Sequence, residues 1–327
     1  MIRTRRIAPG AAVIGLLLLP VACGDDGSSS GGDAITLYTC VSDTTVEPVI
    51  DAFEQAAGTE VDLFRAPTGE LNARIAGDDR SGGLQADVVW GCDPLTMQGY
   101  VDQGLVGGWT PANASDVPAR FRTDDYVGVA VLYLLAVHSD DVQPPQEWSD
   151  LTGPEYADGV AVPDPAFAAS ALGAVGYFEA ESGYGLDFFA DLKGNGAVQV
   201  ASPDEVATGV AQGTYKAGIT IANSAYALQQ DGSPIGVVWP RPGAVAIYGP
   251  VALATESEGS APAKEFITYL VSEEGQRLIS EAGSYPTLPG VPEPTRPEDA
   301  PVVYPDWPAI TADQEDLLVG YQQIFGG

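Results

Sequence analysis

Residues 34–94, AITLYTCVSDTTVEPVIDAFEQAAGTEVDLFRAPTGELNARIAGDDRSGGLQADVVWGCDP, alternate between strand and helix patterns and decide the fold. Short apolar runs predict strands, and apolar residues at helical spacing predict the helices between them. The expected strands are 34–40, 59–65 and 87–91, and the expected helices are 44–57, a segment from 68, and 95–103. This alternation predicts an α/β fold with a parallel sheet and right-handed crossovers, in which ligands bind beyond the carboxyl ends of the strands.

The rest of the chain continues the pattern after one long apolar run, 126–137, which can cross between two lobes. Further strands are expected at 159–163, 197–201, 217–222, 237–240 and 244–255. Further helices are expected at 147–151, 168–181, 186–192, 203–212, 224–230, 261–272, 274–282 and 311–325. A single core stops growing near ~250–300 residues, so a chain of 327 residues predicts two lobes.

The chain is strongly acidic, with 45 Asp and Glu residues against 14 Lys and Arg and a net charge of −31. Such a charge repels phosphate backbones and argues against nucleic acid as a partner. One histidine leaves little room for histidine-based catalysis or a multi-histidine metal site. Hydrophobic residues make up 45% of the chain, which is enough for a full core.

The N-terminus predicts export. Three arginines precede an apolar stretch at 11–22 that is too short to span a membrane, as expected of a signal peptide over 1–22. The ending Pro-Val-Ala-Cys is similar to a lipobox, which would make Cys23 a lipid anchor on the outer face of the cytoplasmic membrane. An ordinary signal peptide is the alternative, and the export route (general or twin-arginine) stays open. Residues 23–33 predict a flexible tether. Cleavage leaves 11 basic residues against 45 acidic ones, a net charge of −34.

Several segments in a fixed order carry a family likeness. They are LYTC (37–40), RAPTGEL (65–71) with RI (74–75), ADVVW (86–90), PPQEWSDL (144–151), VAVPDP (160–165), AGITI (217–221), PVALA (250–254), AKEFITYL (263–270) and SEEGQ (272–276). The chain thereby resembles extracellular solute-binding proteins of ABC importers, and most of all the branch that takes ferric iron or 2-aminoethylphosphonate.

The resemblance implies a type II periplasmic-binding fold, with two lobes joined by a hinge. Lobe 1 is expected at 34–128 plus 245–290 and lobe 2 at 129–244, followed by a Pro-rich segment and a C-terminal helix over 291–327. The implied partners are a small-molecule ligand, an ABC permease and its ATPase. We expect a monomer without a cofactor.

In this fold the ligand lies between the lobes. The candidate ligand-binding residues of lobe 1 follow its strands, and they are Thr39, Ser42, Asp43, Thr44, Arg65, Thr68 and Asp93. Strand ends that meet helix amides suit an anion. Thr44 and Asp93 can instead be helix caps, and Arg65 can instead form a surface ion pair.

The candidates of lobe 2 and of the return to lobe 1 are Asp164, Phe167, Ser170, Asn223, Tyr226, Trp239, Arg241 and Tyr248. Trp239 and Tyr248 can instead pack in the core. Ferric-binding relatives carry adjacent tyrosines where this chain has Ala225 and Tyr226. A small organic anion, with a phosphonate or carboxylate group, is therefore favoured, and a ferric-iron receptor is the alternative.

Cys40 and Cys92 end the first and third predicted strands. In the inferred fold these strands are neighbours, so the two residues can form a disulfide, which persists in exported proteins. Two separately buried thiols are the alternative.

We expect no enzymatic activity. The sequence contains no Gly-x-Ser-x-Gly, His-Glu-x-x-His or phosphate-binding Gly-x-x-x-x-Gly-Lys motif. An exported enzyme and a surface lipoprotein without a transport role are the other classes left open.

Overall fold

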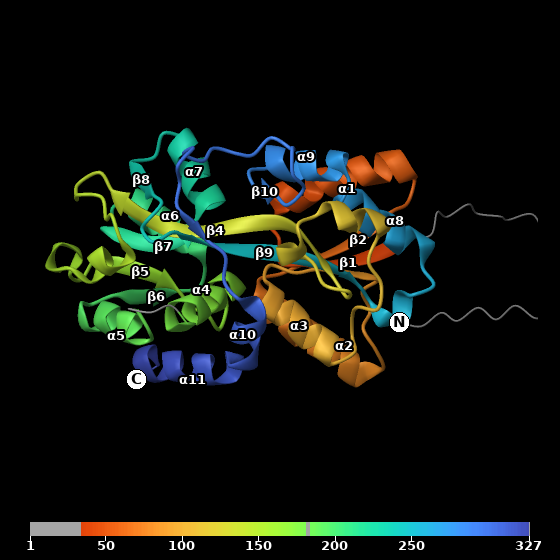
Figure 1. The fold of residues 1–327 in the computed structure, drawn as a ribbon, viewed down its shortest axis with the longest axis horizontal. Helices are drawn as coiled ribbons and strands as arrows, with labels where there is room; N and C mark the ends of the chain where they lie inside the picture. Colours follow the sequence, from red (N-terminus) through yellow and green to blue (C-terminus); the bar gives the residue numbers. More distant parts are fainter. Residues whose placement is uncertain (1–33, 181–183, 327) are drawn as a thin grey trace, which may run out of the picture. The chain divides into compact units, whose positions relative to one another are not determined.

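One mixed β-sheet runs through the computed structural model, which describes residues 34–180 and 184–326. Its main strands follow the order β2-β1-β3-β9-β4-β7-β5-β6 (Figure 1). Their bounds are β1 Ile35–Thr39, β2 Val61–Arg65, β3 Val88–Trp90, β4 Val127–Ser139, β5 Val160–Pro163, β6 Val198–Val200, β7 Ala217–Ile221 and β9 Ala244–Leu253. Three short strands complete the sheet: β8 (Ile235–Val238) and β10 (Tyr285–Pro286) pair with β4, and β11 (Val302–Val303) pairs with β9.

Two lobes share this sheet, and we name them by their strands: lobe 1 is built around β1–β3 and lobe 2 around β5–β7. The strands pair in parallel within each lobe, as predicted. The helices of lobe 1 are α1 (Asp43–Ala57), α2 (Thr68–Ser81), α3 (Pro94–Asp102), α8 (Ala261–Leu270) and α9 (Glu273–Glu281). Those of lobe 2 are α4 (Ala169–Ala180), α5 (Asp187–Gly194), α6 (Pro203–Ala211) and α7 (Ala222–Gln230). Figure 1 shows helices on both faces of the strands in each lobe, so the α/β prediction is confirmed.

The strands β4 and β9 connect the lobes. They pair antiparallel from Val127 opposite Val251 to Leu134 opposite Val245. At one end β9 pairs with β3 of lobe 1, and at the other end β4 pairs with β7 of lobe 2. The expected hinge would lie in these strands. The described residues, 34–180 and 184–326, belong to one compact unit, so the lobe boundaries expected from the sequence stay a prediction.

The C-terminal segment differs from its expected form. The single helix expected at 311–325 is two helices, α10 (Trp307–Ala312) and α11 (Gln314–Phe325), which are separated at Asp313. α10 packs on α3 and α4, and α11 packs on α4 and α5, so this segment contacts both lobes. α4 carries Gly173 and Gly176 where Trp307 and Ile310 approach, and a Cβ atom at either glycine would overlap the facing side chain.

Several short helical segments are 3-10 turns. The helix expected at 147–151 is a 3-10 turn, η3 (Trp148–Thr152), and further 3-10 turns are η1 (Ala112–Asp116), η2 (Ala119–Phe121), η4 (Pro154–Tyr156) and η5 (Thr255–Ser257).

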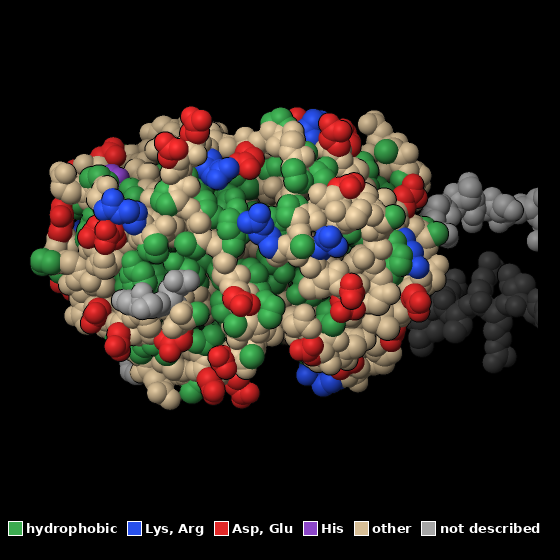
Figure 2. All heavy atoms as spheres, in the orientation of Figure 1, with side chains coloured by type: hydrophobic (Ala, Val, Ile, Leu, Met, Phe, Trp, Pro, Cys, Tyr) green, Lys and Arg blue, Asp and Glu red, His purple; other side chains and the backbone are tan. Residues whose placement is uncertain are grey.

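Figure 2 shows acidic side chains spread over the visible face rather than gathered in one patch. Within 34–180 and 184–326, no helix combines the length and apolar character that a bilayer crossing needs. The expected signal peptide, tether and lipidation at Cys23 lie outside the described residues.

Candidate ligand-binding site

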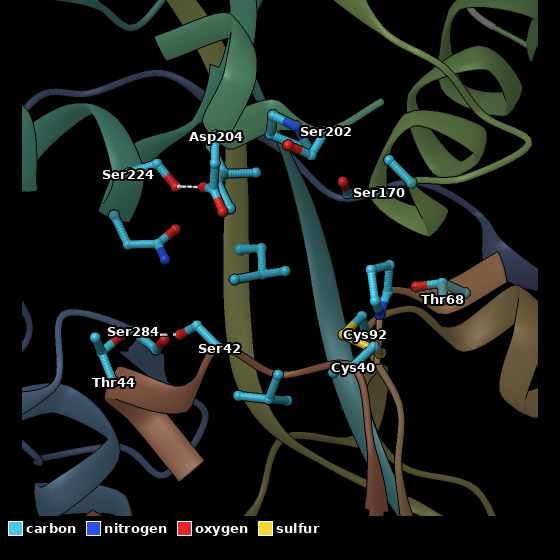
Figure 3. A pocket seen from close by; sticks show the side chains of 18 of the residues that line it. Cys40, Ser42, Thr44, Thr68, Cys92, Ser170, Ser202, Asp204, Ser224 and Ser284 are labelled. Carbon is cyan, nitrogen blue, oxygen red and sulfur yellow. Dashed lines mark hydrogen bonds between the residues drawn. A yellow bond between two sulfur atoms is a disulfide. The ribbon is translucent and has the colours of Figure 1, made fainter. Parts of the chain in front are cut away.

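A cavity of about 610 Å³ lies between the two lobes. This volume is in the range of small-molecule sites, roughly 300–1,000 Å³. Figure 3 shows Ser42, Thr44 and Ser284 of lobe 1 on one side and Ser202, Asp204 and Ser224 of lobe 2 on the opposite side. Ala130, Leu132 and Gly249, from the two connecting strands, also line the cavity.

The N-terminal ends of several helices lie at this cavity. α1, α2, α4, α6 and α7 all contribute residues of their first turn to its lining. The N-cap residues of α1, α2 and α7 are Ser42, Pro67 and Ile221, and none of them caps its helix with a side chain. Proline and isoleucine have no polar side-chain atom to do so. α6 differs, because Ser202 accepts a hydrogen bond from the Glu205 amide. Three helices therefore present main-chain amides without side-chain caps to one cavity.

The polar side chains of the lining are mostly hydroxyls. They come from Ser42, Thr44, Thr68, Ser170, Ser202, Thr208, Ser224 and Ser284. Among the described lining residues the charged ones are Asp43, Asp204 and Arg65. The arrangement is suited to hydrogen-bond a small polar ligand from both lobes.

Arg65 is held at the edge of the lining by two contacts. Its Nε donates to the Val41 carbonyl at 3.1 Å and lies 3.6 Å from Asp43 Oδ1. The side chain keeps 33% of its surface exposed. The surface ion pair considered from the sequence is therefore present. An exposed pair is worth only about 0–1 kcal/mol, so it leaves Arg65 available to a ligand.

On the other side of the cavity, Asp204 accepts a hydrogen bond from the Ser224 hydroxyl. This bond joins the first turns of α6 and α7. In the described chain, no group of three or more His, Cys, Asp or Glu side chains is arranged to hold a metal ion.

The predicted disulfide is present. Cys40 and Cys92 are bonded, with their Cα atoms 5.9 Å apart. The reason lies in the register of β1 and β3, in which Thr39 is opposite Trp90 and the two cysteines leave neighbouring strand ends. Both cysteines line the cavity, so the bond joins two of its loops.

About half of the ligand-binding candidates line the cavity. They are Ser42, Asp43, Thr44, Arg65, Thr68, Phe167, Ser170 and Asn223. Their contact with a ligand stays a prediction. The capping alternative for Thr44 is wrong, because Ser42 holds the N-cap position of α1 and Thr44 lies inside the helix.

Thr39 and Asp93 lie in the core rather than in the lining. Thr39 is fully buried and donates to the Trp90 carbonyl at 2.7 Å, which ties β1 to β3. Asp93 is fully buried and caps α3, since its Oδ1 accepts from the Thr96 amide at 2.8 Å. Burial raises the pKa of Asp93 above its ordinary value, and the hydrogen bond from Thr96 opposes this. The helix-cap alternative is right for Asp93.

Three of the four aromatic candidates, Tyr226, Trp239 and Tyr248, are packed away from the lining. Trp239 donates from Nε1 to the Tyr226 hydroxyl at 3.0 Å, and its ring packs on Tyr133. Tyr248 is buried against Phe121, so its core alternative is right. Tyr248 lies on β9 next to Gly249 of the lining, and the alternation of side chains along a strand turns it to the opposite face. Tyr226 lies on α7 and Trp239 follows β8, so the hydrogen bond between them holds both side chains outside the lining.

Asp164 and Arg241 have local partners outside the lining. Asp164 accepts from the Ala166 amide at 2.8 Å and shapes the turn after β5. Arg241 is 66% exposed and pairs with Glu147 at 3.0 Å.

The sequence interpretation missed part of the lining. The missed polar residues are Ser202, Asp204, Thr208 and Ser284, whereas Ser224 was expected beside Asn223 after the strand at 217–222. The first two follow β6 in an expected strand–helix unit, so the rule about strand ends was sufficient to find them. Ser284 follows α9, and no local pattern marks it as part of a cavity.

Two lobes that share a sheet and enclose a hydroxyl-rich cavity define a ligand-binding protein. The family model for bacterial extracellular solute-binding proteins matches residues 35–284, and the chain belongs to this family. An uncharacterized protein of Haemophilus influenzae is 24% identical over 287 residues, which is 81% of each chain. The spermidine/putrescine-binding periplasmic protein of Salmonella typhimurium is 27% identical over 164 residues, 47% of this chain and 46% of its own length.

Solved structures share the fold. The periplasmic binding protein AfuA of Actinobacillus pleuropneumoniae, with fructose-6-phosphate bound, has a TM-score of 0.82 and 19% identity, covering 91% of this chain and 99% of its own. Iron-bound HitA of Pseudomonas aeruginosa has a TM-score of 0.79 and 18% identity, covering 89% and 99%. The chain is thus a substrate-binding receptor of an ABC-type importer, and it acts outside the cytoplasm.

Proposed function

We propose that this receptor captures a small organic anion with a phosphate-like or phosphonate-like group and delivers it to a membrane permease. The observation that carries the proposal is the meeting of α1, α2 and α7 at one cavity without side-chain caps. Uncapped amides and the positive end of the helix dipole both favour an anion. Each helix start contributes about 0.3–1 kcal/mol, so several acting together give useful affinity.

The contrast with other helices supports the same ligand class. α3, α8, α9 and α10 have side-chain caps from Asp93, Ser260, Ser272 and Asp306. α5 and α11 also lack side-chain caps, but they begin outside this cavity. Arg65 adds the positive charge that a dianionic group needs, since a guanidinium can donate two parallel hydrogen bonds to a phosphate.

Ferric iron is less well supported by the lining. Ferric iron prefers hard oxygen ligands, and the described lining contains no tyrosine or histidine. Tyr226, the candidate phenolate, accepts a hydrogen bond from Trp239 outside the lining. HitA and other proteins of this fold are nevertheless iron-bound, so ferric citrate belongs in the test.

A polyamine is a second candidate, because Asp43 and Asp204 bring two carboxylates to the cavity. A relative over about half of this chain is a spermidine/putrescine-binding protein. Asp43 is already paired with Arg65, and Asp204 with Ser224, which lowers their value to a cation.

Titration against a panel of compounds tests the ligand class. The panel is fructose 6-phosphate, 2-aminoethylphosphonate, inorganic phosphate, putrescine and ferric citrate. A compound present at 100 times its Kd adds about 2.7 kcal/mol of stability, which thermal unfolding detects. We expect a phosphate ester or phosphonate to stabilise the chain. A shift with putrescine or ferric citrate alone would show that the proposed class is wrong.

Arg65→Gln tests the role of the guanidinium. It should weaken binding of the stabilising anion about tenfold or more, because a charge-assisted hydrogen bond is lost. Arg241→Gln is the matched control, since Arg241 is an exposed, paired arginine outside the cavity, and it should leave the affinity unchanged. Equal affinities for the two variants would contradict the role of Arg65.

We further propose that the receptor is anchored through a lipid on Cys23 after removal of 1–22 and that it acts as a monomer without enzymatic activity. The composition of the N-terminal segment supports the anchor. Cys23→Ser should release the protein from the membrane fraction into the medium or periplasm. Retention in that fraction would contradict lipidation.

A further inference from the structure

Phe167 lies where the cavity meets solvent. It lines the cavity, yet 54% of its surface is exposed, the largest value among the exposed large apolar side chains of the described chain. It is not part of the hydrophobic core. Because exposure of an aromatic ring forgoes the free energy of burial, the position needs a reason other than packing within lobe 2.

The loop that carries Phe167 is well held. The Ala166 amide donates to Asp164 Oδ1 at 2.8 Å, and the Ala168 amide donates to the Asp164 carbonyl at 2.8 Å. The Asp164 amide itself donates to Val200 of β6 at 2.9 Å. These bonds place the ring from a rigid support in lobe 2, so its exposure does not come from a loose segment.

Gly69 of lobe 1 meets this loop. It lies in the first turn of α2, next to Thr68 of the lining. A Cβ atom at Gly69 would lie 3.3 Å from the Ala166 carbonyl oxygen and 3.6 Å from Phe167 Cδ1. The first distance is tighter than ordinary van der Waals contact. The absence of a side chain at Gly69 therefore allows the lobes to touch at this point.

A second glycine in α2 shows that the contact is local. Gly77 belongs to the same helix, and a Cβ atom there would have nothing within 4 Å. Glycine within a helix lowers stability by about 0.5–1 kcal/mol relative to alanine. The position of Gly69 is therefore best explained by the close approach of the lobe 2 loop to α2, which a larger side chain would prevent. Gly77 has no such neighbour and serves as a matched control.

We propose that Phe167 is the side chain that closes the cavity against Gly69 when the lobes come together, and that this contact slows release of the ligand. The inference rests on the proposed function in assuming a small ligand in this cavity. It does not depend on the chemical class of that ligand. Phe167 acts as a positioning residue, because it holds lobe 2 over the cavity through its contact with α2.

Cross-linking tests the contact without any ligand. In the Gly69→Cys, Phe167→Cys variant we expect mild oxidation to join positions 69 and 167, seen as a linked peptide by mass spectrometry under non-reducing conditions. The Gly77→Cys, Phe167→Cys variant should give no such link. The native peptide that joins Cys40 to Cys92 reports in both variants that the lobe is folded. Absence of the 69–167 link in a chain with the native disulfide intact would overturn the proposal.

Release kinetics test the consequence. With fructose 6-phosphate as the probe, Gly69→Val and Phe167→Ala should each raise the dissociation rate constant of the ligand about tenfold. About half of the Phe167 side chain is buried, and losing the burial of half an aromatic ring corresponds to a change of about this size. Gly77→Val should change the rate less than twofold, and Phe167→Leu should retain most of the slow release. Equal rates for Gly69→Val and Gly77→Val would refute the closing role. If the chain binds none of the panel but forms the 69–167 link, the proposed ligand class fails and the closing contact stands.

Discussion

Replacing Cys40 and Cys92 together by serine should lower the free energy of unfolding by about 4 kcal/mol. The bridge spans 52 positions. In the chain-entropy model a loop of about 50 residues restricts the unfolded chain by about 14 cal/mol/K, which is about 4 kcal/mol at 25 °C. A chain of about 300 residues unfolds with an entropy near 0.6 kcal/mol/K, so the melting temperature should fall by about 7 °C.

Urea unfolding followed by circular dichroism at pH 7 measures this loss. The reductant dithiothreitol should reproduce it in the unsubstituted chain and have no further effect on the variant. Because β1 and β3 remain paired through Thr39 and Trp90, the cavity should persist and ligand affinity should change less than threefold. A loss below about 1 kcal/mol would refute the entropic reasoning, and it would mean that the unfolded chain already keeps these segments close.

Two further substitutions test buried features, each against a matched control. Asp93→Asn should raise the free energy of unfolding at pH 7, because burial raises the pKa of Asp93 and the folded state favours the neutral acid. The stability that the protonated Asp93 side chain contributes is fully present at low pH and is lost as the pH rises through its folded-state pKa. The gain in stability over the unsubstituted chain, measured by thermal unfolding, should therefore shrink from pH 7 towards pH 4. Asp306→Asn changes the exposed cap of α10 and should give no gain at either pH. A gain for Asp93→Asn that does not depend on pH would contradict the argument. Gly176→Ala should destabilise the chain by about 1–3 kcal/mol in urea unfolding, because its Cβ atom would overlap Ile310 of α10. Gly77→Ala, with open space around it, should instead stabilise by about 0.5–1 kcal/mol, and similar effects of the two substitutions would show that α10 does not pack on α4 as described.

The strands were the most predictable part of the fold. Buried runs such as 34–40 and 87–91 became β1 and β3 within two residues at each end, because a buried strand needs a continuous apolar run. The break between α10 and α11 was not predictable from periodicity, since the apolar face of 311–325 continues through Leu317, Tyr321 and Phe325. Helix boundaries depend on caps and on the surface that receives the helix.

The candidate site was predictable only at the level of loops. Thr39 ends β1 and Ser42 follows it as the N-cap of α1, yet Ser42 lines the cavity whereas Thr39 is buried and donates a hydrogen bond to the Trp90 carbonyl. Asp93 and Asp204 both begin helices, and again only one reaches the cavity. Which of two neighbours faces the ligand depends on the pleat and register of the sheet, which the pattern of residue types leaves open.

By itself the sequence determined the alternation of strands and helices and the family likeness, and through that likeness it predicted a disulfide between Cys40 and Cys92, with two free thiols as the alternative. These follow from local patterns and from cysteines that leave adjacent strand ends. Only the tertiary structure decided which side chains enclose the cavity, that α1, α2 and α7 meet there without side-chain caps, and that Phe167 lies next to Gly69. The physical reason is that a local pattern reflects near neighbours along the chain. A cavity between lobes is formed by residues about 100 positions or more apart, such as Thr68 and Phe167, and their meeting depends on how the whole sheet positions the two lobes.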